Sequence, residues 1–470
     1  MTESTMTHIK QDNPIQSTHL TFYHNFAPLQ HEQNSPNYHN NIAKIKPHLD
    51  ALLSKKIINK SEQQAVTHHH GRTPSYRNEL DPIMACCNDI HHQRITINNI
   101  PIKNVCQIGI GGSTSGPHAM HQALNIWGFK TKCNAYFISN HDDAHIAKTL
   151  STIDISETLF IIASKSGTTI EIQKIIDTII QTNQLDPKTF YSNQCMVITT
   201  QNSPLNNDQY LEQFLFDPTI GGRYSTTSIV GLFILGITFG SAIINQILDG
   251  AYAADTQDLN LDSPHSSIAL NQAILNVAYR NTHNLTQLAL VPYGEAFTKF
   301  PDFLTQLISE SLGKSVTTNG KPSTTNNCPH IIHGIGPDAQ HSFFQQLHQA
   351  TPITPCEFIF TQPTTPNQHH LLQQICGQMT ALHQGAPSQT HHSYFSGNRP
   401  STLLMLNETT PQTLGALIAT YENRVMFEAL LLNINAFDQP GVELGKTITQ
   451  SISTTGQDIG SQLYQSILNK

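Results

Sequence analysis

Residues 164–169, SKSGTT, bring four hydroxyl side chains, one lysine and one glycine together at a single turn. The apolar run 158–164 leads into the turn, and isoleucines at helical spacing follow it. A strand that enters a helix at this point would aim backbone N–H groups at the turn, and these groups, the hydroxyls and Lys165 could hold a phosphate. The alternative is a tight turn whose serines and threonines only cap the helix, and this loop alone does not decide between the two.

A second loop of the same kind is IGIGGSTSGP, residues 108–117. It follows the apolar run 105–110 and leads into a helical stretch in which Pro117 suits the first turn. Its glycines allow a ligand to approach the backbone closely. Dinucleotide binding fits poorly, because GIGGSTSG lacks the GxGxxG spacing and no P-loop lysine follows the glycines. Both loops are candidate anion sites, each with a plain turn as its alternative.

Two further segments carry groups suited to proton transfer. Arg223 lies beside glycines in IGGRYSTTS, where a guanidinium could stabilise an oxyanion or form a structural ion pair. In FLTQLISESLGK, residues Gln306, Glu310 and Lys314 follow one another at i, i+4 on one helix face. Glu310 is therefore either a carboxylate base or half of a surface pair with Lys314.

His341 and the segment FDQPGVELGK (437–446) complete the candidates. His341 lies in GIGPDAQHSFFQQLHQ, where a capping or core histidine is the default interpretation. The segment 437–446 places the amide of Gln439 close to the amine of Lys446. No one of these segments is decisive by itself.

Composition excludes several classes of function. The net charge of −8 gives no general attraction to nucleic acid or to anionic membranes. Eight cysteines show no CxxC pair, and the adjacent histidine pairs lack the i, i+4 spacing of helix metal ligands, so we expect neither disulfides nor a metal site. No signal peptide is expected at the N-terminus. The uncharged segment 226–248 contains polar residues and favours a buried helix over a membrane span. The cysteines are interpreted as buried thiols of a reducing compartment, and we expect a cytoplasmic protein.

These side chains need a scaffold, and the apolar pattern indicates one. Short apolar runs alternate with helical stretches, which is typical of parallel sheets covered on both faces, so the fold class is α/β with doubly wound parallel sheets. The runs lie at 105–110, 135–139, 158–164 and 195–200, and again at 288–292, 330–336, 357–360 and 402–406. We predict a polar N-terminal arm at 1–45, α/β domains at 46–255 and 256–437, and a C-terminal helical tail at 438–470.

Taken together and in this order, the segments resemble the glucose-6-phosphate isomerase (phosphoglucose isomerase) family, whose members have two sugar-isomerase (SIS) domains. The resemblance runs from about residue 61 to Lys446. Its most specific parts are DPTIGGRYS, GNRPSTLLMLNETTPQTLGALIATYENRVMF and NINAFDQPGVELGK. It implies reversible isomerisation of glucose 6-phosphate and fructose 6-phosphate in glycolysis and gluconeogenesis, through ring opening and a cis-enediolate, with no cofactor and no metal.

The resemblance also implies a role for each candidate residue. Glu310 would move the proton between C2 and C1, Arg223 would stabilise the enediolate, and His341 and Lys446 would assist ring opening. His341 would reach the active site from the other subunit of a homodimer. Substrate contacts would come from Gly112, Ser113, Gln306 and Gln439, and phosphate contacts from Ser164, Lys165, Ser166 and Thr169.

Several positions depart from the family pattern, although every residue given a role is present. STSGP, GPDAQH and Pro440 replace commoner family sequences, which puts substrate breadth and rate in question more than reaction class. Two alternatives stay open at this point. A dual-specificity enzyme would also accept mannose 6-phosphate, but its members carry a hydroxyl residue where this chain has Gln439. A non-catalytic sugar-phosphate sensor would have lost the base, and Glu310 stands against it.

Overall fold

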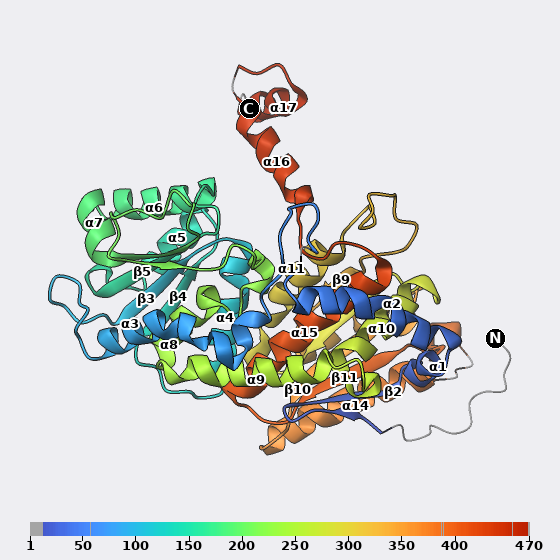
Figure 1. Cartoon of the computed structure of the whole chain (residues 1–470). Coiled ribbons are helices and arrows are strands. Elements are labelled where there is room, and N and C mark those ends of the chain that lie inside the picture. Colours follow the sequence, from blue (N-terminus) through green and yellow to red (C-terminus); the bar gives the residue numbers. More distant parts are fainter. Residues whose placement is uncertain (1–12, 57, 387, 389, 454, 469–470) are drawn as a thin grey trace.

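The computed structural model describes residues 13–56, 58–386, 388, 390–453 and 455–468. Its two sheets lie side by side with helices around them, and both sets of predicted strands are confirmed (Figure 1). The first sheet has the order β4-β3-β5-β6-β7 and is parallel throughout. Its strands are β3 (Asn104–Ile108), β4 (Asn134–Ile138), β5 (Thr158–Ala163), β6 (Cys195–Thr199) and β7 (Glu212–Leu215), of which β7 was not predicted.

Helices cover both faces of this first sheet. Strand residues point alternately to the two faces, so Phe160 and Ile162 pack on one side while Leu159 and Ile161 pack on the other. The first face is covered by α5 (Asp143–Leu150), α6 (Ile170–Thr182) and α7 (Pro187–Gln194). The second face is covered by α3 (Asp81–His91), α4 (Ser115–Ile126) and α8 (Ile229–Phe239). Because both faces of the sheet are buried, its predicted strands are continuous apolar runs in which polar residues do not alternate with apolar ones.

The second sheet has the order β1-β2-β11-β10-β8-β9. Its parallel strands are β8 (Gln287–Pro292), β9 (His330–His333), β10 (Cys356–Thr361) and β11 (Ser401–Leu406). One face packs on α12 (Gly336–Gln340), α13 (Phe344–Gln349) and α14 (Pro366–Gln384). The other face joins the large central core with α10 (Ile268–Asn281), α11 (Phe300–Leu312) and α15 (Pro411–Leu432).

Residues 13–45 form regular elements, which corrects the prediction of a polar N-terminal arm at 1–45; residues 1–12 of that prediction lie outside the described part of the chain. Strand β2 (Leu20–Phe26) pairs antiparallel with β11, and β1 (Ile15–Gln16) pairs with β2. Helices α1 (Leu29–Gln33) and α2 (Pro36–Leu53) follow, and α2 buries Tyr38, Ile45 and Leu49. Polar composition hid these elements because β2 buries polar residues, Thr21 and His24, beside its apolar ones, and because a surface helix needs only one apolar face.

The segment 226–248 is not one buried helix. It breaks at Gly240, whose φ of +107° interrupts the helical hydrogen bonds, and gives α8 and α9 (Ala242–Asp258). Helix α9 crosses α15 in close contact, because a Cβ atom on Gly250 would lie 1.7 Å from the carbonyl oxygen of Gln412. Among the described residues, no helix has the length and apolar character needed to span a membrane. The predicted domain limits at 45, 255 and 437 stay predictions, and residue 255 lies within α9.

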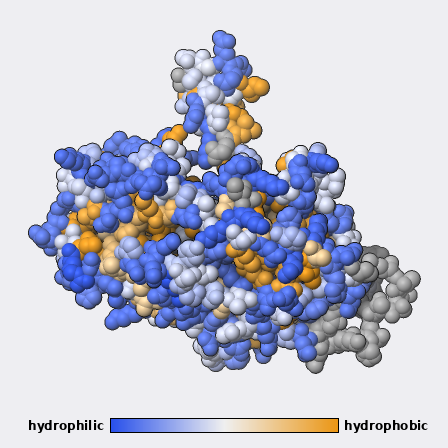
Figure 2. Space-filling model, in the orientation of Figure 1, coloured by the Kyte–Doolittle hydropathy of each residue, from blue (hydrophilic) through white to orange (hydrophobic). Residues whose placement is uncertain are grey.

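The predicted C-terminal helical tail consists of α16 (Pro440–Ser451) and α17 (Ile459–Leu468). It projects away from the body of the molecule (Figure 1). Apolar side chains are exposed along it, which Figure 2 shows as orange atoms on the projecting arm. The most exposed are Leu444, Ile459, Leu463 and Ile467.

Asp258, at the end of α9, makes stability dependent on pH. Its carboxylate accepts hydrogen bonds from Ser267 Oγ (3.2 Å), the Ala269 N–H (3.1 Å) and Thr420 Oγ1 (3.1 Å), yet burial raises its pKa to about 7. Because the folded pKa lies above the ordinary value of 3.8, the folded state holds the extra proton, and this contribution to stability is lost as pH rises from 4 to 7.

We expect Asp258→Asn to remove that loss. The slope of the unfolding free energy against pH between 4 and 7 should become less negative by up to about 1.4 kcal/mol per pH unit. Urea unfolding of both proteins at several pH values measures it. Asp262→Asn, at a side chain that is 90% exposed, is the matched control. Parallel curves for wild type and Asp258→Asn would contradict the prediction.

Candidate active site

The two predicted anion loops lie at the same edge of the first sheet. Each follows a parallel strand at its carboxyl end, β3 for residues 108–117 and β5 for residues 164–169, and β3 pairs directly with β5. Helix α4 begins at Ser115, within the first loop, and α6 begins at Ile170, directly after the second. Ligands of open α/β sheets bind at this edge, where loops and helix N-termini converge.

The loop 164–169 is held by its own hydroxyls. Ser164 Oγ accepts from the Gly167 N–H (3.1 Å), and the Gly167 φ of +67° is one that glycine adopts without strain. Thr169 occupies the N-cap position of α6 but its side chain makes no capping hydrogen bond. Lys165 Nζ donates to the carbonyl of Ile220 (3.4 Å), and burial lowers the pKa of this lysine. Plain helix capping therefore does not account for Thr169.

Lys446 approaches this loop from the C-terminal tail. A cavity of about 730 Å³ separates α16 from the start of α6. Ser166, Thr168 and Thr169 line one side, and Lys446 lies on the other. The structure thus brings Lys446 and the predicted phosphate loop to one cavity, although Thr169 and Lys446 are 277 positions apart in the sequence.

Arg223 and Glu310 form the charged centre of the site. Arg223 lies in the short helix η5 (Gly222–Tyr224) and is 1% exposed, while the Glu310 side chain on α11 is 27% exposed. Arg223 NH1 donates to Glu310 Oε2 (3.3 Å) and to Gln439 Oε1 (2.6 Å). Gln306 Nε2 donates to the other Glu310 oxygen (3.2 Å). A carboxylate that faces solvent thus lies against a buried cation.

The remaining donors of Arg223 are also occupied. Its Nε donates to Ser311 Oγ (2.7 Å), and its NH2 donates to the carbonyls of Ala436 and Asp438, the latter at 3.1 Å. With the two NH1 bonds, every N–H of the guanidinium has a partner, which fixes its plane. The bond to Glu310 is the longest of the five.

The first loop closes against this centre. Ser115 Oγ donates to Gln306 Oε1 (2.8 Å), and a Cβ atom on Gly112 would lie 2.2 Å from the carbonyl oxygen of Gly222. Only glycine fits there, because the backbone of the loop rests on the backbone that carries Arg223. Ser113 is partly exposed beside Gly112.

Neither Lys314 nor His341 is hydrogen-bonded to the Arg223 and Glu310 pair. The alternative of a surface pair between Glu310 and Lys314 is wrong, since α11 ends at Leu312 and Lys314 Nζ bonds to Asp438 instead. His341 ends α12 with an exposed side chain and is not among the hydrogen-bonded residues around Arg223. Sequence reasoning also missed Ser311 and Asp438, although both lie within segments already selected.

The arrangement suits proton transfer next to a carbonyl group. Such a reaction needs a carboxylate over the carbon and a cation or donor at the oxygen where charge develops. Glu310 and Arg223 provide that pair, and the loop 164–169 provides an anion site at the same sheet edge. Among the residues that the structure describes, no three His, Cys, Asp or Glu side chains are grouped so that they could bind a metal ion.

The fold and these side chains define an α/β protein with a carboxylate and guanidinium site at the carboxyl ends of parallel strands. A sequence profile of the phosphoglucose isomerase family matches residues 39–463, and the chain belongs to that family. It is 37% identical over 439 residues to a glucose-6-phosphate isomerase of Treponema pallidum, covering 86% of this chain and 81% of that protein. It is 35% identical over 464 residues to one of Borreliella afzelii, covering 92% and 87%.

A solved structure agrees with the family. The crystal structure of a glucose-6-phosphate isomerase from Chlamydia trachomatis aligns with a TM-score of 0.87 and 28% identity, covering 98% of this chain and 93% of that one. The expected α/β fold with parallel sheets and a helical C-terminal region is confirmed.

Proposed function

We propose that this chain is a glucose-6-phosphate isomerase, which interconverts D-glucose 6-phosphate and D-fructose 6-phosphate through ring opening and a cis-enediolate. The observation that carries the proposal is the Glu310 carboxylate held 3.3 Å from the Arg223 guanidinium beside an anion loop, in a chain of the phosphoglucose isomerase family. In this role the enzyme serves glycolysis and gluconeogenesis in the cytoplasm.

The phosphate anchors the sugar in the loop 164–169. Ser164, Lys165, Ser166 and Thr169 bind it, and Gly112, Ser113, Gln306 and Gln439 contact the sugar. Since the phosphate is remote from C1 and C2, its binding energy serves to orient the reacting carbons.

Glu310 transfers the proton between C2 and C1. Its carboxylate removes the proton from the carbon next to the carbonyl, and the pair of electrons moves onto the oxygen to form the enediolate. Arg223 NH1 meets the developing charge, because its bond to Glu310 is long and is the one most readily exchanged for a substrate oxygen. Returning the proton to the other carbon gives the isomeric sugar.

His341 and Lys446 open the pyranose ring by moving a proton between O1 and O5. We assign His341 to the active site of a second copy of the chain, so the working form is a homodimer. Two observations support this assignment: the exposed side chain of His341, and the exposed apolar residues of the projecting tail, such as Leu463 and Ile467. Exposed apolar groups of this kind are usual where another subunit covers them.

A coupled assay tests the proposed function. The purified chain is given fructose 6-phosphate, and the glucose 6-phosphate formed is oxidised by an NADP-dependent dehydrogenase. We expect turnover that a chelator of divalent metals leaves unchanged, and little conversion of mannose 6-phosphate. A chain that binds sugar phosphates without converting them would contradict the proposal and favour a sensor.

The phosphate loop has its own prediction. Thr169→Ala should raise KM for fructose 6-phosphate about tenfold or more and change kcat much less, because a hydrogen bond to a charged group contributes about 1.5–3 kcal/mol. Steady-state kinetics measure both constants. Thr182→Ala, at the exposed far end of the same helix α6, is the control. An unchanged KM would mean that Thr169 does not contact the phosphate.

A further inference from the structure

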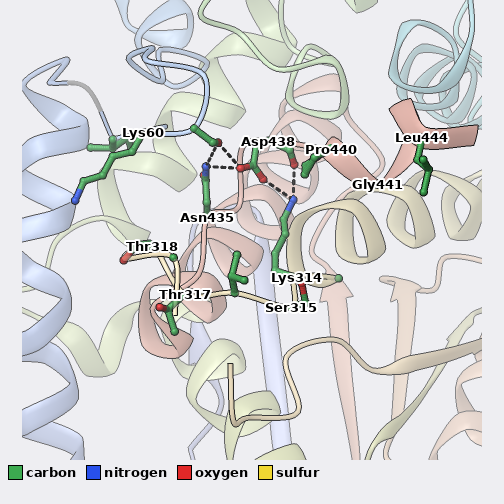
Figure 3. Close-up of a pocket in the computed structure, with 15 residues that line it drawn as sticks. Lys60, Lys314, Ser315, Thr317, Thr318, Asn435, Asp438, Pro440, Gly441 and Leu444 are labelled. Carbon is green, nitrogen blue, oxygen red and sulfur yellow. Dashed lines mark hydrogen bonds and ion pairs between the residues drawn. The ribbon is translucent and has the colours of Figure 1, made fainter. Parts of the chain in front are cut away.

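Lys314 and Asp438 form a largely buried ion pair behind the active site. Lys314 Nζ donates to Asp438 Oδ1 (2.8 Å) and to the Asp438 backbone carbonyl, and the two side chains are 9% and 12% exposed. Figure 3 shows Lys314 extending toward Asp438 with Asn435 on the other side, along the wall of a cavity of about 630 Å³. Asn435 Nδ2 (2.9 Å) and Ser61 Oγ donate to the second carboxylate oxygen.

The segment that this pair holds, residues 436–439, supplies most of the acceptors for Arg223. The carbonyls of Ala436 and Asp438 accept from NH2, and the Gln439 side chain accepts from NH1. The Asp438 carbonyl accepts from Lys314 and Arg223 together. Because two cations converge on one carbonyl, the carboxylate of Asp438 is needed nearby to offset their repulsion.

We propose that Lys314 and Asp438 are positioning residues, which set the Arg223 guanidinium and the Gln439 amide against the substrate without touching it. The inference rests on the proposed isomerase function and extends it to residues behind the site. Lys314 follows α11, the helix that carries Glu310, and bonds to segment 436–439, which holds Arg223. The ion pair therefore keeps Glu310 and Arg223 in a fixed position relative to each other. A displacement of about 1 Å between such groups can lower the rate about 100-fold.

The titration of the pair agrees with this geometry. Burial alone would raise the pKa of Asp438, but hydrogen bonds from Lys314, Ser61 and Asn435 lower it below its ordinary value. Burial lowers the pKa of Lys314, and its bonds to Asp438 oppose that shift. Because three donors converge on the Asp438 carboxylate, the site favours its charged form beside Lys314.

An ion pair that only stabilises the fold is the alternative, and kinetics separate the two. Lys314→Met should lower kcat by about 10- to 100-fold, with KM for fructose 6-phosphate changed less than about threefold, because the phosphate loop is untouched. Asp438→Asn, which keeps the size of the side chain, should act in the same direction. Lys60→Met is the matched control, since Lys60 lines the same cavity but is exposed.

A double-mutant cycle supplies the readout that a merely structural pair would not change. In an Arg223→Lys background, Lys314→Met should lower kcat by less than about threefold, since the guanidinium through which the pair acts is gone. If Lys314→Met lowers kcat by the same factor in both backgrounds, or if Lys314→Met and Asp438→Asn both keep the wild-type kcat, this inference is overturned while the proposed function stands. Wild-type turnover is measured first, and its absence would overturn the proposed function and this inference together.

Discussion

Glu310→Gln should lower kcat for fructose 6-phosphate by about 100- to 10,000-fold, the range over which positioned acids and bases contribute to rate. Glutamine has the same shape, and its carbonyl oxygen can still accept from Arg223 or Gln306, so the site should keep its geometry. It cannot accept the substrate proton, however. KM should therefore change little while the isomerisation step is lost.

Two controls make this result specific to the base. Glu295→Gln changes an exposed carboxylate just before the same helix α11, and it should keep wild-type activity. Binding of a sugar phosphate to Glu310→Gln, followed by calorimetry, should persist. Equal activity in wild type and Glu310→Gln would remove Glu310 from the mechanism. It would also remove the proposed proton transfer at the pair of Glu310 and Arg223.

The sequence predicted the core of the fold because burial on both faces imposes a strong pattern. Runs such as TLFIIA become central strands with every residue buried, and Ile172, Ile175, Ile176 and Ile179 form the buried face of α6. The same logic could not find β2, an antiparallel strand at residues 20–26, because its pairing with β11 joins segments almost 400 residues apart. Such pairing depends on the tertiary structure, which local periodicity does not encode.

The same distinction applies to the site residues: local sequence reveals some of them, and only the tertiary structure reveals the others. The hydroxyl loop and Glu310 were recognisable from residue type and from neighbouring elements. The partner of Lys314 was not, since i, i+4 spacing predicts contact with Glu310 only while the helix continues. Helix α11 ends two residues earlier, and Lys314 turns toward Asp438, which is 124 residues away in sequence. Ser311 was hidden likewise, because its importance lies in the hydrogen bond to Arg223 Nε.

Mixing two inactive variants should restore activity if His341 acts across a dimer. His341→Ala subunits keep Glu310, and Glu310→Gln subunits keep His341, so a hybrid dimer has one site with both groups intact and one site with neither. Random exchange of equal amounts makes about half of the dimers hybrid, and about one quarter of all sites should regain activity. The coupled assay measures this recovery after subunit exchange, which labelled subunits verify independently.

The recovery distinguishes the two placements of His341 because they predict opposite outcomes. If each chain used its own His341, every site of a hybrid dimer would lack one group, and mixing would restore nothing. Mixing His341→Ala with the His341→Ala, Glu310→Gln double variant is the control, since no site then contains a histidine. We expect recovery because His341 is exposed at the end of α12 and lies apart from the residues bonded to Arg223. No recovery after verified exchange would mean that His341 does not act across the dimer.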